Sequence, residues 1–261
     1  GDWSSDVCSS DLMLKIGLIG CGKAGQAVAS ALQGEPDLAL RWIARRTKPR
    51  DLDDCCPAGL PVVGLDKIDL ADWLDEHPVD ALIDFSGPDA VHLYGEEVRR
   101  RRLILVTAIS AYSQADLAYI RSLGESARVM SSPNITLGIN FLILAARLLR
   151  EIAPHADIAI LEEHFRDKPE ISGTARKIAE SLDLEDASIT SLRLGGIVGH
   201  HEVVFGFPYQ TVRLSHDSIR REAFGTGAAF AVRELAKQVG PGYFSFEDLL
   251  MQRMRAQWLQ A

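Results

Sequence analysis

Short apolar runs alternate with amphipathic stretches along the first half of the chain, from Met13 to about residue 132. The apolar runs have the length of buried strands, and the amphipathic stretches have the spacing of surface helices. Strands that alternate with helices in this way predict a parallel sheet with helices on both faces. The expected strands cover 14–19, 38–44, 79–85, 103–107 and 127–130, and the expected helices cover 26–32, a stretch opening at Pro88 and a stretch opening at Ser113.

The pattern changes after Pro133. The expected strands there cover 157–162, 188–194, 202–207 and 210–214, and the expected helices cover 138–152, 172–182, 224–239 and 246–259. The last three strands follow one another without an intervening helix, which is typical of antiparallel strands. The sequence therefore predicts an α/β fold with a Rossmann-like, doubly wound parallel sheet, followed by a second α+β domain with a mixed or antiparallel sheet.

The composition is that of an ordinary globular protein, with 47% hydrophobic residues, 25% charged residues and a net charge of −8. An acidic chain is a poor candidate for a nucleic-acid binder, whose affinity depends on neutralising phosphates. The longest unbroken apolar run, 141–146, is far shorter than the roughly 20 residues of a membrane helix. The four cysteines show neither zinc-ligand spacing nor a preceding secretory signal. We therefore expect a cytoplasmic protein without a metal, a membrane or a nucleic acid as partner.

Residues 1–12 differ in character from the rest of the chain. They have no hydrophobic period and no Lys or Arg, and they precede a Met that opens the first expected strand. We interpret this segment as a non-native extension. Without it the net charge is −5 rather than −8, because the segment holds three aspartates.

A glycine-rich turn lies between the first expected strand and the first expected helix. Glycines at the first, third and sixth positions of such a turn allow a tight bend of the chain. They also let backbone N–H groups approach a pyrophosphate at the helix start. A purely structural turn is the alternative, but it does not explain three glycines at this spacing. The turn fits the dinucleotide-binding pattern Gly-x-Gly-x-x-Gly with Gly20, Cys21, Gly22, Lys23, Ala24 and Gly25.

The end of the second expected strand distinguishes NADPH from NADH. An enzyme that uses NADH usually carries an acidic residue about 20 positions after the glycine turn. Here the strand runs into Arg45-Arg46-Thr47-Lys48, with no acid before Asp51. Paired guanidinium groups bind a 2′-phosphate through forked, charge-assisted hydrogen bonds. We therefore expect Arg45 and Arg46 to favour NADPH, with NADH possible but weaker; a solvated basic turn is the alternative.

The segment 162–175 places groups for proton transfer beside groups for anion binding. A strand delivers His164 and Lys168 to a loop, and the next helix begins at Ser172, Gly173 and Thr174. Free backbone N–H groups at a helix start bind carboxylates, and a threonine hydroxyl adds a donor. Beside a hydride donor, this combination suits the reduction of a C=N or conjugated C=C bond in a small carboxylic acid. Each piece alone has a structural alternative, since a histidine is often structural and a serine is an ordinary N-cap.

These residues also carry a family resemblance. The segment from His164 to Lys168 fits His-His-x-x-Lys with Phe165 as the second residue, and Ser172–Ala175 reads Ser-Gly-Thr-Ala. On these motifs the chain resembles the dihydrodipicolinate (4-hydroxy-tetrahydrodipicolinate) reductase family of lysine biosynthesis, from Lys15 to about Leu250. Supporting matches lie at 84–88, 134–140, 193–201 and 216–227.

The resemblance implies a homotetramer of two-domain subunits that uses NAD(P)H to reduce a cyclic unsaturated dicarboxylate to tetrahydrodipicolinate. Residues 13–137 with 222–261 would form the dinucleotide-binding domain, and residues 138–221 the substrate-binding and oligomerisation domain. Lys168 would donate a proton with His164 as its acid/base partner, and Ser172, Gly173 and Thr174 would hold a substrate carboxylate. Besides the glycine turn and the arginine pair, the cofactor would contact Phe85, Ser86, Ala108, Ile109, Ser110, Ser132, Pro133, Asn134 and Ile135.

Several positions depart from the family pattern. Phe165 removes an expected substrate contact, Gly87 stands where an arginine is common, and residues 108–111 lack the usual Gly-Thr-Thr-Gly sequence. The segment between Lys168 and Ser172 is also one residue short. A divergent paralogue that reduces another small imine or enoic acid is therefore an alternative. A second alternative is a non-catalytic NADP-sensing protein, although a sensor does not need the His164/Lys168 pair.

Overall fold

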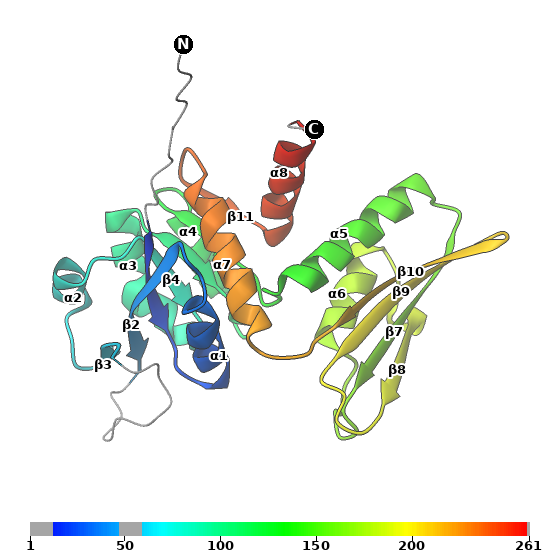
Figure 1. The fold of residues 1–261 in the computed structure, drawn as a ribbon, viewed down its shortest axis with the longest axis horizontal. Helices are drawn as coiled ribbons and strands as arrows, with labels where there is room; N and C mark the ends of the chain where they lie inside the picture. The colour runs from blue at the N-terminus through cyan, green and yellow to red at the C-terminus, as the bar shows by residue number, and fades with distance from the viewer. Residues whose placement is uncertain (1–12, 47–58, 260–261) are drawn as a thin grey trace, which may run out of the picture.

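The computed structural model describes residues 13–46 and 59–259. The expected extension at 1–12, the basic residue Lys48 and three of the four cysteines therefore lie outside the described residues. The chain forms two lobes, each built on its own β-sheet (Figure 1). Within the described ranges, no helix is both long enough and apolar enough to cross a membrane.

The first lobe holds a seven-stranded sheet in the order β11-β6-β5-β4-β1-β2-β3. All neighbouring strands in it are parallel, as the alternation of strands and helices predicted. The strands are β1 (Leu14–Ile19), β2 (Leu38–Arg45), β3 (Val62–Gly64), β4 (Ala81–Asp84), β5 (Ile104–Thr107), β6 (Arg128–Ser131) and β11 (Gly242–Phe244). The helices of this lobe are α1 (Lys23–Leu32), α2 (Leu70–Glu76), α3 (Val91–Arg101), α4 (Gln114–Leu123), α7 (Ala223–Ala236) and α8 (Phe246–Trp258), with a short 3-10 helix (Pro88–Ala90) before α3.

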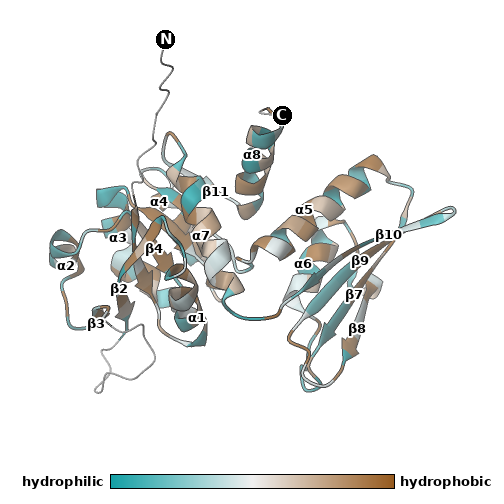
Figure 2. Ribbon diagram, viewed as in Figure 1, coloured by the Kyte–Doolittle hydropathy of each residue, from teal (hydrophilic) through white to brown (hydrophobic). Residues whose placement is uncertain are grey.

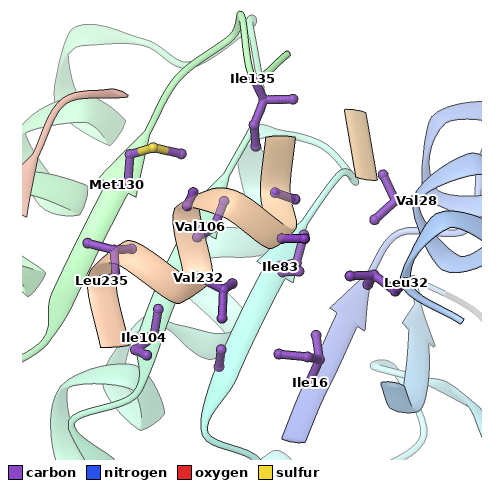
Figure 3. Close-up of a cluster of buried hydrophobic side chains, with 14 of the residues drawn as sticks. Ile16, Val28, Leu32, Ile83, Ile104, Val106, Met130, Ile135, Val232 and Leu235 are labelled. Atoms are coloured by element: carbon purple, nitrogen blue, oxygen red, sulfur yellow. The ribbon is translucent and has the colours of Figure 1, made fainter. Parts of the chain in front are cut away.

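Two hydrophobic clusters, one on each face of this sheet, hold the helices in place. The first joins the sheet to α1, α7 and α8 and includes Ile16, Val28 and Val232 (Figure 3). The second joins the sheet to α2, α3 and α4 and includes the fully buried Trp42 and Tyr94. Because both faces are covered, the strands are nearly continuous apolar runs, coloured brown in Figure 2. The sheet is therefore doubly wound, as predicted.

The second lobe holds a four-stranded sheet in the order β10-β9-β7-β8. Its strands are β7 (Asp157–His164), β8 (Ile189–Arg193), β9 (His200–Phe207) and β10 (Gln210–Asp217), and its helices are α5 (Leu137–Ile152) and α6 (Gly173–Ser181), with a 3-10 helix at Asp186–Ser188. The two α-helices pack on the sheet through a cluster that includes Ile143, Ile178 and Phe205. Strand β9 runs antiparallel to β7 and β10, whereas β8 runs parallel to β7. The sheet is mixed, which is one of the two expected forms.

The last three strands alternate in direction, as expected, but β8 does not pair with β9; it lies at the other side of β7 and pairs with that strand in parallel. Helix α6 lies between β7 and β8 in the chain and packs on the sheet, so this unit is a βαβ crossover whose two strands run parallel. The hydrophobic pattern also failed to indicate β3, α2 and β11, which have only 3, 7 and 3 residues. Elements this short carry too few periods to stand out from a loop.

The chain crosses between the lobes twice, first into α5 and then from β10 into α7. The two crossings lie in contact. A Cβ at Gly138, on α5, would lie 2.7 Å from the imidazole Cδ2 of His216, on β10, and a Cβ at Gly227, on α7, would overlap the carbonyl oxygen of Ile135. The loop before α5 is therefore held between the second crossing and α7.

Candidate active site

The glycine turn is packed so closely that two of its residues must lack a side chain. Gly20 has a φ of +98°, and a Cβ there would lie 2.6 Å from the carbonyl carbon of Phe85. A Cβ at Gly25 would overlap the carbonyl oxygen of Gly20. At Gly22, in contrast, a Cβ would meet nothing within 4 Å. The turn thus brings α1 close to the end of β1 and leaves open space beside Gly22.

The start of α1 offers backbone donors to a ligand. Gly22 is the N-cap and provides no side-chain hydrogen bond, and the first turn contains no acidic residue. The first N–H groups of a helix have no partner within the helix, and the helix dipole favours an anion at this end. Cys21 is buried here and Lys23 is exposed. The residues present therefore fit the pyrophosphate of a dinucleotide.

The other predicted cofactor residues follow neighbouring strands at one edge of the sheet. The N–H of Phe85 donates to the carbonyl of Ile19 over 2.8 Å, and the N–H of Ser132 donates to the carbonyl of Thr107 over 2.9 Å. Because the strands are parallel, their carboxyl ends and the loops that follow share this edge. The structure places there Phe85, Ser86, Ala108, Ile109, Ser110, Ser132, Pro133, Asn134 and Ile135.

The arginine pair lies at the end of the neighbouring strand β2. Arg45 is the last residue of β2 and Arg46 follows it. Arg46 forms an ion pair of 3.5 Å with Asp89, and the two side chains are 78% and 84% exposed. An ion pair this exposed contributes little, so the guanidinium group of Arg46 can exchange Asp89 for a ligand.

Asp84, the last residue of β4, is a buried carboxylic acid to which the sequence analysis assigned no role. It accepts hydrogen bonds from the Ser86 N–H (2.8 Å), the Ser86 hydroxyl (2.5 Å) and the Tyr94 hydroxyl (2.7 Å). Burial raises the pKa of Asp84 above its ordinary value, although these hydrogen bonds oppose the shift. The acid fixes the position of Phe85 and Ser86 beside the glycine turn.

His164 ends β7, and Glu162 lies two residues earlier on the same face of the strand. Both side chains are buried, and Glu162 is completely buried. They lie where β7 ends and β9 begins, and these parts of the two strands are hydrophilic in Figure 2. The Nδ1 atom of His164 is hydrogen-bonded to Glu162. Burial alone would raise the pKa of Glu162, but hydrogen bonds from Arg193, Ser191 and His164 lower it to about 2. Glu162 is therefore ionised.

Lys168 lies in the loop between β7 and α6. Its N–H donates to the carbonyl of Phe165 over 3.1 Å, and its own carbonyl accepts from the Nε of Arg193 over 3.0 Å. The side chain is half-buried, and its ammonium group forms no ion pair with any residue of the described ranges. The backbone of Lys168 is thus held in place while its side chain is available to a ligand.

The start of α6 combines an internal cap with an open anion site. The Ser172 hydroxyl accepts from the Ala175 N–H (3.4 Å) and is hydrogen-bonded to the Nε2 of His201 (2.8 Å). Burial lowers the pKa of His201 to about 3, so this ring is neutral. Because the Ser172 side chain is engaged inside the protein, the open part of the site is formed by Gly173, which is exposed, and Thr174.

Thr174 connects this helix start to the edge of the first sheet. Its hydroxyl donates to the Oδ1 of Asn134 over 3.3 Å. The side-chain amide of Asn140 in turn donates to the carbonyl of Asn134 over 2.7 Å, which fixes the loop after β6. The structure therefore brings the expected anion site of the second lobe into hydrogen-bond contact with the expected cofactor loop of the first lobe.

No role was predicted from the sequence for Glu162, Arg193 or His201. A usable signal was present in β7, where Ile160, Glu162 and His164 alternate on the buried face. An acid at a buried position of a strand must be paired, because an isolated buried charge is too costly. Its partners could not be identified from spacing, since Ser191 and Arg193 come from β8, about 30 residues later.

Comparison with known proteins gives matches over nearly the whole chain. The family description "Dihydrodipicolinate reductase, N-terminus" matches residues 14–135, and "Dihydrodipicolinate reductase, C-terminus" matches residues 135–250. The 4-hydroxy-tetrahydrodipicolinate reductase of Caldanaerobacter subterraneus subsp. tengcongensis is 28% identical over 263 residues, covering 92% of this chain and 99% of that protein. The enzyme of the same name from Laribacter hongkongensis is 30% identical over 272 residues, covering 92% and 98%.

Solved structures show the same fold. The dipicolinate-bound dihydrodipicolinate reductase from Paenisporosarcina sp. TG-14 superposes with a TM-score of 0.74 at 21% identity, covering 90% of this chain and 98% of that one. These matches confirm the predicted Rossmann-like fold and the predicted enzyme class, an NAD(P)H-dependent oxidoreductase. Since the two family matches together span residues 14–250, the chain belongs to the dihydrodipicolinate reductase family.

Proposed function

We propose that this protein is an NADPH-dependent 4-hydroxy-tetrahydrodipicolinate reductase, which reduces a cyclic unsaturated dicarboxylate to tetrahydrodipicolinate in lysine and diaminopimelate biosynthesis. The hydrogen bond of 3.3 Å between Thr174 and Asn134 carries the proposal, because it joins a helix start suited to a carboxylate to a loop suited to a dinucleotide. The names of the curated relatives support the choice of substrate.

In this proposal the second lobe binds the substrate and handles the proton. The N–H groups of Gly173 and Thr174 hold a substrate carboxylate at the positive end of α6. Lys168 donates a proton to the reduced bond, and His164 acts as its acid/base partner. The bound nicotinamide supplies the hydride. The buried Ser172 does not contact the substrate directly in this proposal; its hydroxyl accepts a hydrogen bond from the Ala175 N–H and so fixes the start of α6.

The first lobe binds the cofactor in this proposal. The glycine turn from Gly20 to Gly25 binds the pyrophosphate. The loops that contain Phe85, Ser110 and Asn134 contact the rest of the cofactor. The guanidinium groups of the half-buried Arg45 and the exposed Arg46 bind the 2′-phosphate of NADPH, so NADH binds more weakly.

Replacing both Arg45 and Arg46 by Ala tests this preference. We expect KM for NADPH to rise about 10- to 100-fold, because charge-assisted hydrogen bonds to the 2′-phosphate are lost, and KM for NADH to change little. Steady-state kinetics with both cofactors measures this, with Arg41→Ala, an exposed position on the same strand, as the control. An equal loss for both cofactors contradicts the assignment.

The reaction itself is tested by coupled oxidation of NADPH with the product of dihydrodipicolinate synthase, together with complementation of a diaminopimelate auxotroph. We expect turnover and growth. Failure of both, with cofactor binding intact, favours the divergent paralogue. The observation that favours this second candidate is Phe165, whose side chain is 45% exposed beside the Lys168 loop and offers no hydrogen bond to a carboxylate.

We further propose that the subunits form a homotetramer through the second lobe. Exposed apolar side chains on and beside β8, Leu192 and Leu194, support self-association there. Analytical ultracentrifugation measures the assembly, and a monomer at micromolar concentration contradicts it. The domain division at residues 137 and 222 and the location in the cytoplasm remain predictions.

A further inference from the structure

Glu162 is the centre of a buried polar network at the end of β7. Its Oε1 accepts from the Ser191 hydroxyl (2.6 Å), from an Nη of Arg193 (2.7 Å) and from the Ser172 N–H (3.3 Å). Its Oε2 accepts from the other Nη of Arg193 (3.0 Å) and pairs with the Nδ1 of His164. The carboxylate thus forms hydrogen bonds with three different segments of the second lobe, including a bidentate ion pair with Arg193.

The network determines which nitrogen of His164 carries the hydrogen. An ionised carboxylate only accepts hydrogen bonds, so the Nδ1 of His164 must donate to it. In the neutral ring the lone pair is then on Nε2. The Nε2 atom forms no hydrogen bond with any residue in 13–46 or 59–259. Gly199 lies beside it without a side chain, and a Cβ there would stand 3.1 Å from Nε2. The Nε2 lone pair therefore has no partner within the described residues, although the ring itself is buried.

The same network holds the loop that carries Lys168. The Nε of Arg193 donates to the carbonyl of Lys168 (3.0 Å), and one of its Nη atoms donates to the carbonyl of Glu170 (2.8 Å). The Glu162 contact to the Ser172 N–H fixes the end of this loop where α6 begins. Strand register makes the arrangement possible, since Glu162 pairs with Ser191 and His164 with Arg193 across β7 and β8.

We propose that Glu162 and Arg193 are positioning residues of the reductase site. Glu162 holds His164 in the tautomer with Nε2 open to the substrate, and Arg193 holds the Lys168 loop against the same carboxylate. The two residues thereby place the acid/base pair and the carboxylate site relative to one another. The catalytic consequence rests on the proposed function, whereas the tautomer of His164 does not.

The test of the tautomer is Glu162→Gln, which keeps the shape of the side chain and removes its charge. Long-range ¹H–¹⁵N correlation spectra at alkaline pH, where an ordinary imidazole is neutral, report which nitrogen of His164 is protonated. We expect a single Nδ1–H form in the unmodified protein and a substantial Nε2–H population in the variant, because the amide can donate to Nδ1. We also expect kcat to fall about 10- to 100-fold, because the acid/base group is misplaced, with KM for NADPH unchanged. The matched control is Glu163→Gln, one residue along β7 on the other face, which should change neither.

The test of the loop is Arg193→Lys, which retains the positive charge but loses the forked contacts. We expect the ¹³C shifts of the Lys168 and Glu170 carbonyls to move and kcat to fall at least about 10-fold, while His164 keeps its Nδ1–H form. If Glu162→Gln does not fold, the spectrum of the unmodified protein decides the first half, because an Nε2–H form of His164 there overturns it.

An unchanged His164 tautomer in Glu162→Gln, or unchanged carbonyl shifts in Arg193→Lys, overturns the corresponding half of the proposal. If the unmodified protein shows no reductase activity, the proposed function fails, but the two spectroscopic results still decide whether the network positions His164 and the loop.

Discussion

Replacing Lys168 by Ala is expected to lower kcat by about 10²- to 10⁴-fold, the usual contribution of a positioned general acid, while NADPH binding stays nearly unchanged. The reason is that the proton donor and the proposed cofactor-binding residues lie in different lobes. Lys168 lies in the loop between β7 and α6, whereas the glycine turn and Arg45 belong to the first sheet. Turnover kinetics and NADPH titration by fluorescence measure the two effects separately.

The control for this prediction is Lys67→Ala, an exposed lysine of the first lobe, which should leave kcat unchanged. Retention of the full kcat in Lys168→Ala would show that the proton comes from elsewhere. A parallel loss of NADPH binding would show that the variant disturbs the first lobe, and this result would also contradict the assigned role.

Replacing Gly227 by Ala is expected to destabilise the protein by about 1–3 kcal/mol or more, in the range of overpacked cores. The added Cβ would overlap the carbonyl oxygen of Ile135, which is backbone and cannot rotate away. Helix α7 must then move off the loop that carries Asn134, so we also expect a higher KM for NADPH. Denaturant unfolding and kinetics measure the two effects.

Gly240→Ala is the matched control, since a Cβ at that exposed position would meet nothing within 4 Å. We expect its free energy of unfolding to stay within about 0.5 kcal/mol of the unmodified protein. Equal stability of the two glycine variants would mean that α7 does not press on the Ile135 loop.

Most of the fold was predictable because the first sheet is buried on both faces. Strands such as β1 and β4 are apolar runs with a single charged residue each, and the helices between them are amphipathic, so each element has its own pattern. The pairing of β8 with β7 rather than with β9 was not predictable in this way, because it depends on α6 packing across the sheet. Periodicity reports which face a strand buries and carries no information on its neighbours in the sheet.

The candidate site was predictable where its residues are neighbours in sequence. His164, Lys168 and Thr174 lie within one short segment, and family motifs mark them. Glu162 differs from Glu163 in the sequence only by its alternation with Ile160 and His164, and the strand register decides that this face is the buried one. Arg193 reaches the site from β8, through a pairing that only the folded sheet reveals.

The two chain crossings between the lobes determine how the molecule can deform. A single connection would allow one lobe to twist and slide freely against the other. Here the two connections are in contact, with Gly138 against His216 and Gly227 against Ile135. Together they define the axis of a hinge between the lobes. Rotation about the line through both contacts strains neither of them, whereas sliding breaks both. We therefore expect the lobes to rotate about these contacts rather than to slide past each other, without changing the fold of either lobe.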